Sequence, residues 1–130
     1  MQYLLTIYVD EAAFTHATPE EGMAMTAAYD ALTAELKEAG VFLGGEGLQP
    51  TSTATTVRVR DGEPLLTDGP FAETREQLGG FYLLECANLD EAVRWAAKIP
   101  GAQHGAVEVR PCVVFEDAQA ASANGEAARA

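Results

Sequence analysis

The feature that most restricts the fold of this chain is a predicted helix whose sequence carries a capping signal at each end. Thr18-Pro19-Glu20-Glu21 has the form of a capping box, with Thr18 as the cap, proline at the first helical position and Glu21 at the third. Gly40 stands where a left-handed residue would end the helix. Between these ends, apolar residues recur at spacings of three and four, as on one helix face: Met25, Tyr29, Leu32, Leu36 and Ala39.

A second, shorter helix follows the same logic. Asn88 predicts its N-cap, and Glu91 repeats the acidic residue three positions later. Pro100-Gly101 ends the segment. The side chains expected to face the core are Leu89, Val93, Ala96 and Ala97.

Four runs of β-forming residues surround the two helices. Residues 2–9 (QYLLTIYV) are apolar on both faces and predict a central strand. Residues 41–48 read as a strand interrupted by glycines, and residues 81–87 as a buried strand. The alternation over 106–110 predicts the last strand, which we expect residues 113–115 to extend.

A hairpin is expected in the middle of the chain. Residues 54–60 alternate between two faces and predict a half-exposed strand. Asp61-Gly62 is a strong hairpin signal, and the return strand, residues 63–67, contains Pro64, which belongs at a sheet edge. Residues 68–78 are expected to form a loop or a single helical turn.

The resulting order, β-α-β-hairpin-β-α-β, predicts an α+β, ferredoxin-like βαββαβ fold with an inserted hairpin. Two helices would cover one sheet face and leave the other bare, which predicts a homodimer. The strands bearing Cys86 and Cys112 would flank the first strand, roughly 10 Å apart. Because a disulfide needs Cα atoms within about 7 Å, both thiols are expected to be reduced.

Length and charge exclude several classes of protein. The chain has 130 residues, enough for one domain, with 8 basic and 20 acidic residues and a formal net charge of −12. Such a surface repels phosphate backbones and anionic lipids, so we expect no direct nucleic-acid or membrane binding. The sequence shows no apolar run long enough to span a membrane and no recognisable secretory signal, which predicts a cytoplasmic protein. Residues 117–130 are alanine-rich and predict a flexible tail.

Acidic residues after the hairpin are the candidates for catalysis. Asp68 follows the predicted edge strand and precedes Gly-Pro. Its carboxylate could act as a general base or hold a ligand, or it could cap the turn instead. Glu73 could supply a second carboxylate and so divide acid and base roles, and Glu76 is a weaker candidate. Solvated loop charges are the alternative for both glutamates.

Candidates for ligand binding lie elsewhere. Glu46 sits between glycines, which suits either a ligand pocket or a β-bulge. Arg58 and Arg110 could bind an acidic substrate, or could neutralise neighbouring carboxylates. His104 could titrate near neutrality or simply lie on the surface. No residues show metal-ligand spacing, so we expect neither a metal nor a cofactor.

One segment carries a family resemblance. DGPFAETREQLGG, residues 68–80, resembles the signature of the DGPF subgroup of YCII-related proteins, and the likeness extends over residues 1–116. It implies a dimeric α/β barrel in which two ferredoxin-like sheets pack face to face. Some members are labelled transcription-initiation proteins or are encoded beside extracytoplasmic-function sigma factors. The wider group is linked to a His-Asp pair, but neither His16 nor His104 falls inside the first helix, where that histidine is expected.

Three functions remain open from the sequence. The first is a homodimer that binds a small molecule in a cleft, with acid–base chemistry by Asp68 helped by Glu73 and Glu46. The second is a non-enzymatic regulatory protein whose acidic surface contacts a basic partner such as a sigma factor. In the third, the motif is architectural: its glycines and proline set turns, and Phe71 fills the dimer seam.

Overall fold

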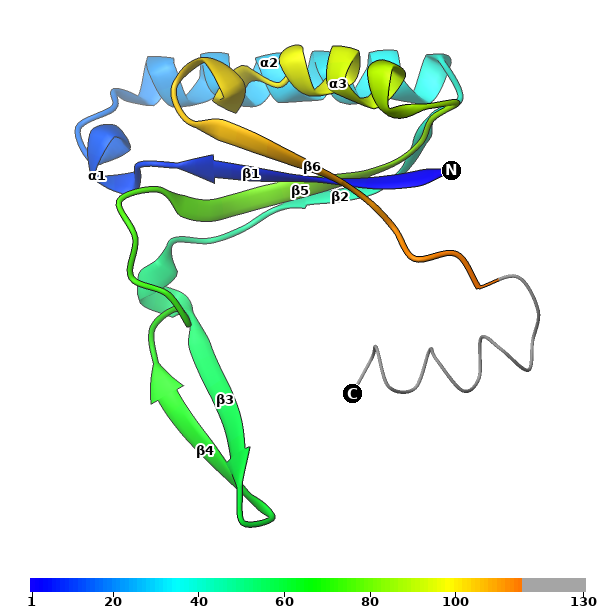
Figure 1. The fold of residues 1–130 in the computed structure, drawn as a ribbon. Coiled ribbons are helices and arrows are strands. Elements are labelled where there is room, and N and C mark those ends of the chain that lie inside the picture. The colour runs from blue at the N-terminus through cyan, green and yellow to red at the C-terminus, as the bar shows by residue number, and fades with distance from the viewer. Residues whose placement is uncertain (116–130) are drawn as a thin grey trace.

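The computed structural model describes residues 1–115 as one sheet covered by helices, with a hairpin projecting from its other side (Figure 1). The helices are α1 (Glu11–Phe14), α2 (Pro19–Glu38) and α3 (Leu89–Ala97), with 3-10 turns η1 (Thr51–Thr53) and η2 (Pro100–Gln103). The strands are β1 (Gln2–Val9), β2 (Phe42–Gly47), β3 (Thr55–Arg60), β4 (Glu63–Asp68), β5 (Gln77–Glu85) and β6 (Ala106–Pro111).

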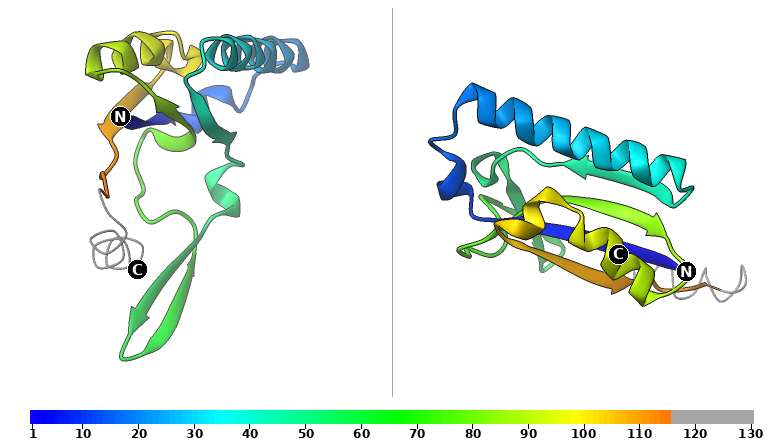
Figure 2. Two further views of the ribbon diagram at one scale, coloured as in Figure 1. Left: turned by 90° about the vertical axis from the view of Figure 1, so that its right-hand side faces the viewer. Right: turned by 90° about the horizontal axis from the view of Figure 1, so that it is seen from above.

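The main sheet has the strand order β2-β5-β1-β6, and every neighbouring pair is antiparallel. This order is compatible with the ferredoxin-like α+β fold that the sequence predicts. Both long helices lie on the same side of the sheet in each view (Figure 2). β3 and β4 pair only with each other, as a separate two-stranded sheet. None of the helices within residues 1–115 is long and apolar enough to cross a membrane.

Helix α2 begins and ends where its sequence signals place it. The Thr18 hydroxyl accepts a hydrogen bond from the Glu21 N–H at 3.1 Å, and the Glu21 carboxylate reaches back to the Thr18 N–H. Gly40 has a φ of +74°, as a left-handed C-terminal residue should. One prediction is wrong: Ala39 is exposed, because it forms the C-cap and lies beyond the buried stripe.

Helix α3 is capped by Asn88, as predicted, but turns a different face to the sheet. Ala92 and Ala96 are buried, whereas Leu89 and Val93 are about half exposed. Ala97, also expected inside, is exposed. The reason is the close approach of α3 to the sheet, which small side chains permit and leucine or valine would prevent.

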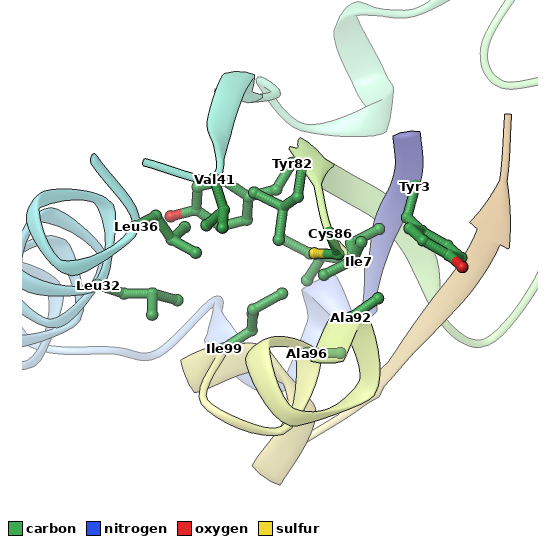
Figure 3. Close-up of a cluster of buried hydrophobic side chains, with 12 residues drawn as sticks. Tyr3, Ile7, Leu32, Leu36, Val41, Tyr82, Cys86, Ala92, Ala96 and Ile99 are labelled. Atoms are coloured by element: carbon green, nitrogen blue, oxygen red, sulfur yellow. The ribbon is translucent and has the colours of Figure 1, made fainter. Parts of the chain in front are cut away.

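The hydrophobic core lies between the helices and the covered face of the sheet (Figure 3). Its largest fully buried side chains come from four different elements or their ends: Leu5, Leu36, Leu84 and Ile99. β5 and β6 flank β1, as expected for the strands leading to the two cysteines. Both cysteines are free, with Cys86 buried and Cys112 partly exposed.

The hairpin forms at the predicted turn. Asp61 and Gly62 both have positive φ, 53° and 77°, the pattern of a type I′ turn. Its strands are not half-buried as expected, however: Val57 and Val59 are 58% and 60% exposed, because the hairpin leaves the sheet and packs on no other element.

Two strand boundaries differ from the predictions. β5 begins at Gln77, so Gly79 and Gly80 lie inside it; Gly80 pairs with Ile7 and Gly47, and Gly79 falls at the register shift opposite β1. Residues 113–115 do not extend β6; the register of β6 ends at Pro111, and Val113 is 71% exposed. The predicted tail, residues 117–130, lies outside the described residues.

Candidate functional site

A cleft of about 770 Å³ separates the middle of α2, over residues 25–33, from the sheet. The buried residues of α2, Leu32 and Leu36, lie in its C-terminal half, so the first turns stand away from the strands. β1, β2 and β5 form the floor, and α1 and Pro50 form one end. Most of the wall is apolar, as is usual for sites that bind organic molecules.

Two glycines shape this space. A Cβ at Gly45 would lie 2.8 Å from Cδ1 of Tyr82, so only glycine lets β2 pass this close to the Tyr82 ring. A Cβ at Gly101 would lie 2.8 Å from the Tyr29 hydroxyl oxygen and 2.9 Å from Cγ2 of Ile7. The floor of the cleft therefore depends on close packing that side chains larger than hydrogen would block.

A row of hydroxyl groups crosses the cleft from α2 to β5. The Thr33 and Tyr82 hydroxyl oxygens lie 2.9 Å apart, and Thr33 Oγ1 also lies 2.9 Å from the Tyr29 carbonyl oxygen, to which it donates. The Gly101 N–H donates to the Tyr29 hydroxyl oxygen at 3.1 Å.

Burial raises the pKa of Tyr29 above its usual value, so its phenol stays protonated near neutral pH. The Gly101 N–H already occupies one lone pair of the Tyr29 oxygen, while the hydroxyl hydrogen is paired with no acceptor among residues 1–115. Tyr29 can therefore donate a hydrogen bond to a polar group of a bound molecule.

Three carboxylates line the cleft, in two different situations. Glu11 is held in place: its carboxylate accepts from the Thr51 N–H at 2.9 Å and from the Thr51 hydroxyl at 2.7 Å, which ties α1 to η1. Asp30 and Glu46 are exposed, and their carboxylates accept no hydrogen bond from the described residues. No arginine, lysine or histidine contributes to the described lining. The Lys37 ammonium, which is not part of this lining, lies 5.3 Å from the ring centre of the lining residue Phe42.

Of the six predicted site residues, only Glu46 lines the cleft. The bulge considered for this region is also present, but it falls between Phe42 and Gly44. His104 is exposed, and its ring packs edge-on against Phe14 of α1, with the ring centres 6.3 Å apart. His104 thus lies behind a wall residue of the cleft.

Asp68 and Glu73 lie away from the cleft. Asp68 is the last residue of β4, opposite Thr55, and its side chain is exposed. Glu73 is exposed in the loop that follows, and the two carboxylates share no hydrogen-bond partner among residues 1–115. Backbone contacts close the turn instead: the Gly69 N–H donates to the Ala54 carbonyl at 2.7 Å, and Gly69 has a φ of +103°.

The two arginines are engaged elsewhere. The Arg58 guanidinium lies 5.1 Å from the ring centre of Phe71, a cation–π arrangement at the base of the hairpin. Arg110 forms an ion pair of 2.6 Å with Glu108 on the uncovered face of the sheet. Glu76 lines a shallower hollow of about 500 Å³ on that face, next to Tyr8 and Glu108.

Sequence reasoning missed the hydroxyl row and read Tyr29 as part of the core stripe alone. A signal was present on α2: Thr26, Asp30 and Thr33 recur at spacings of four and three, which places polar groups along one line of the helix. All three line the cleft. No group of three metal-ligating side chains comes together in the described part of the chain.

Comparison with known proteins gives one family. Residues 1–116 match the YCII-related domain. An uncharacterised protein of Rhizobium meliloti (strain 1021) is 39% identical over 118 residues, which cover 89% of this chain and 95% of that relative.

Proposed function

This chain belongs to the YCII-related domain family, and we propose that it is a homodimeric protein of the DGPF subgroup that binds a small molecule in the cleft beneath α2. The subgroup is supported by the segment DGPFAETREQLGG over residues 68–80. A dimeric α/β barrel is supported by the uncovered sheet face, where Leu4, Phe81 and Leu83 are only partly buried. Two free cysteines support a reducing cytoplasm.

The observation that carries the proposal is the composition of the cleft. Its apolar walls suit a molecule with an apolar body, and the Tyr29 hydroxyl suits a polar end that accepts a hydrogen bond. Glu11, Asp30 and Glu46 line the space without a basic residue beside them. An anionic ligand would be repelled there, so the expected ligand is neutral or cationic.

Binding rather than catalysis is the function that this arrangement supports. The two residues predicted to carry acid–base chemistry, Asp68 and Glu73, do not line the cleft, so neither is within reach of a molecule bound there. Glu46 is the remaining predicted carboxylate that could contact a ligand. We therefore propose that Glu46 orients the polar end of the ligand.

Three probes with one apolar body and different charges test the proposal: 2-phenylethylamine, 2-phenylethanol and phenylacetate. Isothermal titration should detect the amine and the alcohol and give no signal for the carboxylate. Thr26→Trp, on the cleft side of α2, should abolish binding by filling the space. Ala27→Trp is the matched control, since Ala27 is also exposed on α2 but does not line the cleft.

Two results would contradict the proposal. Phenylacetate binding as tightly as the amine would remove the electrostatic argument. Equal binding by both tryptophan variants would show that the probes bind outside the cleft. If none of the probes binds, the net charge of −12 favours the alternative, a regulatory protein that contacts a basic partner such as a sigma factor.

A further inference from the structure

The hairpin formed by β3 and β4 is the part of residues 1–115 that lacks a packing partner. Every residue of β4 is exposed, and in β3 only Thr56 is partly buried. A two-stranded hairpin alone is marginally stable in water at best, because it has no third element against which to bury side chains. Its side chains therefore need a surface that the rest of the described chain does not supply.

The two faces of the hairpin differ in chemistry. The register pairs Val57 with Leu66 and Val59 with Pro64, so these four side chains share one face. Val57, Val59 and Leu66 are 58%, 60% and 69% exposed. We call this set, Val57, Val59, Pro64 and Leu66, the apolar face of the hairpin. An exposed apolar stripe of this kind marks an interaction surface.

The opposite face is more polar. It pairs Arg58 with Leu65 and Arg60 with Glu63. β3 itself carries two arginines and no acidic residue, in a chain whose net charge is −12. The polar side chains of this face suit contact with solvent, so the apolar face is the one that needs a partner.

The position of the hairpin identifies that partner. It extends from the side of the sheet that the helices leave uncovered and points away from it (Figure 1; Figure 2, left). The uncovered face carries the partly buried Leu4, Phe81 and Leu83. Two unpaired apolar surfaces thus lie on the same side of the molecule, and the hairpin does not cover its own sheet.

We propose that the hairpin is a dimerisation arm whose apolar face packs on the uncovered sheet face of a second copy of this chain. The inference rests on the homodimer proposed above and adds the surface that makes it. A two-fold axis would form each contact twice, so that each hairpin completes the partner's sheet face.

Neighbouring leucines on opposite hairpin faces provide a matched test. Leu66→Asp places a charge on the apolar face, and Leu65→Asp places the same charge on the other face; the wild-type side chains are 69% and 50% exposed. Neither contributes to the core, so both variants should keep the wild-type circular dichroism spectrum and melt cooperatively. Sedimentation equilibrium should show the Leu66→Asp dimer dissociating about 100-fold more readily, and the Leu65→Asp dimer within about threefold of wild type.

The possible outcomes test the proposed hairpin arm and the proposed homodimer separately. If wild type is dimeric and Leu66→Asp dissociates no more readily than Leu65→Asp, the arm is wrong and the homodimer stands. If wild type remains a monomer at 100-fold the protein concentration used in an ordinary assay, both the arm and the homodimer are contradicted. Hydrogen exchange gives a second reading: the amides of β3 and β4 should exchange slowly in the dimer and quickly on dilution to monomer. Fast exchange in a stable dimer would also overturn the arm.

Discussion

The hydroxyl oxygens of Thr33 and Tyr82 lie 2.9 Å apart and join α2 to β5 across the cleft. Because Thr33 donates to the Tyr29 carbonyl, the hydrogen between the two hydroxyls belongs to Tyr82. This contact links the first long helix to the sheet at the point where the helix moves away from it. It therefore fixes the width of the cleft.

Removing the Tyr82 hydroxyl tests this link. Tyr82→Phe should lower the free energy of unfolding by about 0.5–1.5 kcal/mol, the usual net value of one hydrogen bond. Urea unfolding measures the difference. Tyr3→Phe is the control, because Tyr3 is equally buried, at 6% exposure, and its hydroxyl bonds no other group in residues 1–115. Equal losses in both variants would assign the effect to packing rather than to the hydrogen bond.

A methyl group at Gly101 should disturb the cleft floor. Gly101→Ala places Cβ 2.8 Å from the Tyr29 hydroxyl oxygen and 2.9 Å from Cγ2 of Ile7. Relieving this overlap should cost about 1–3 kcal/mol of stability, as overpacking of a core usually does. Gly22→Ala should have the opposite effect. The added Cβ meets no atom within 4 Å. Alanine within helix α2 should therefore raise the free energy of unfolding by about 0.5–1 kcal/mol. A Gly101→Ala variant as stable as wild type would show that the residues of the cleft floor shift easily to make room for the methyl group.

The buried thiol of Cys86 predicts a change in stability at high pH. Burial and the neighbouring Glu91 carboxylate raise the pKa of Cys86 to about 11, against an ordinary value of 9.0. Between these values the unfolded chain loses the proton and the folded chain keeps it. The unfolded state then binds fewer protons, so stability falls as pH rises from about 9 to about 11 and is unaffected by this thiol below that range.

Urea unfolding at pH 8 and pH 10 measures the effect of Cys86. Wild type should lose more stability between these two pH values than Cys86→Ala. Cys112→Ala should behave as wild type, because Cys112 is only partly buried. Identical pH dependence in wild type and Cys86→Ala would mean that the thiol contributes nothing to it.

Local signals predicted the parts of the fold that are decided locally. The capping box at Thr18 and the turn at Asp61-Gly62 depend on residues a few positions apart, and both are found where expected. The inward face of α3 depends on how closely it approaches the sheet, which is a tertiary property. Size and hydrophobicity favoured Leu89, whereas the space available admits Ala92.

The site was harder to predict for the same reason. The cleft exists because Gly45 and Gly101 let aromatic rings approach the backbone across elements distant in sequence. Charged residues in a recognisable motif, such as Asp68 and Glu73, stand out in a sequence whether or not a cavity lies beside them. A row of hydroxyls beneath a helix does not stand out, because Thr33 and Tyr82 are 49 positions apart in the sequence and meet only in the fold.

The two residues at the start of the DGPF segment should therefore differ in their effect on stability. Asp68 is exposed, and its side chain bonds no group within residues 1–115, so Asp68→Asn should change the free energy of unfolding by less than about 0.5 kcal/mol. Gly69 has a φ of +103°, and its N–H and carbonyl bond Ala54 and the Thr56 hydroxyl. Gly69→Ala should cost about 1–2 kcal/mol, because a side chain is strained in that conformation.

Thermal and urea unfolding of the two variants, side by side, separate the roles of backbone and side chain in this turn. A loss of stability confined to Gly69→Ala would show that the glycine sets the turn and leave the Asp68 carboxylate free for contact with a ligand or a partner. A comparable loss in Asp68→Asn would instead show that the carboxylate holds the turn. Asp68 would then be a structural residue, and the acid–base role expected for it from the sequence would have no remaining support.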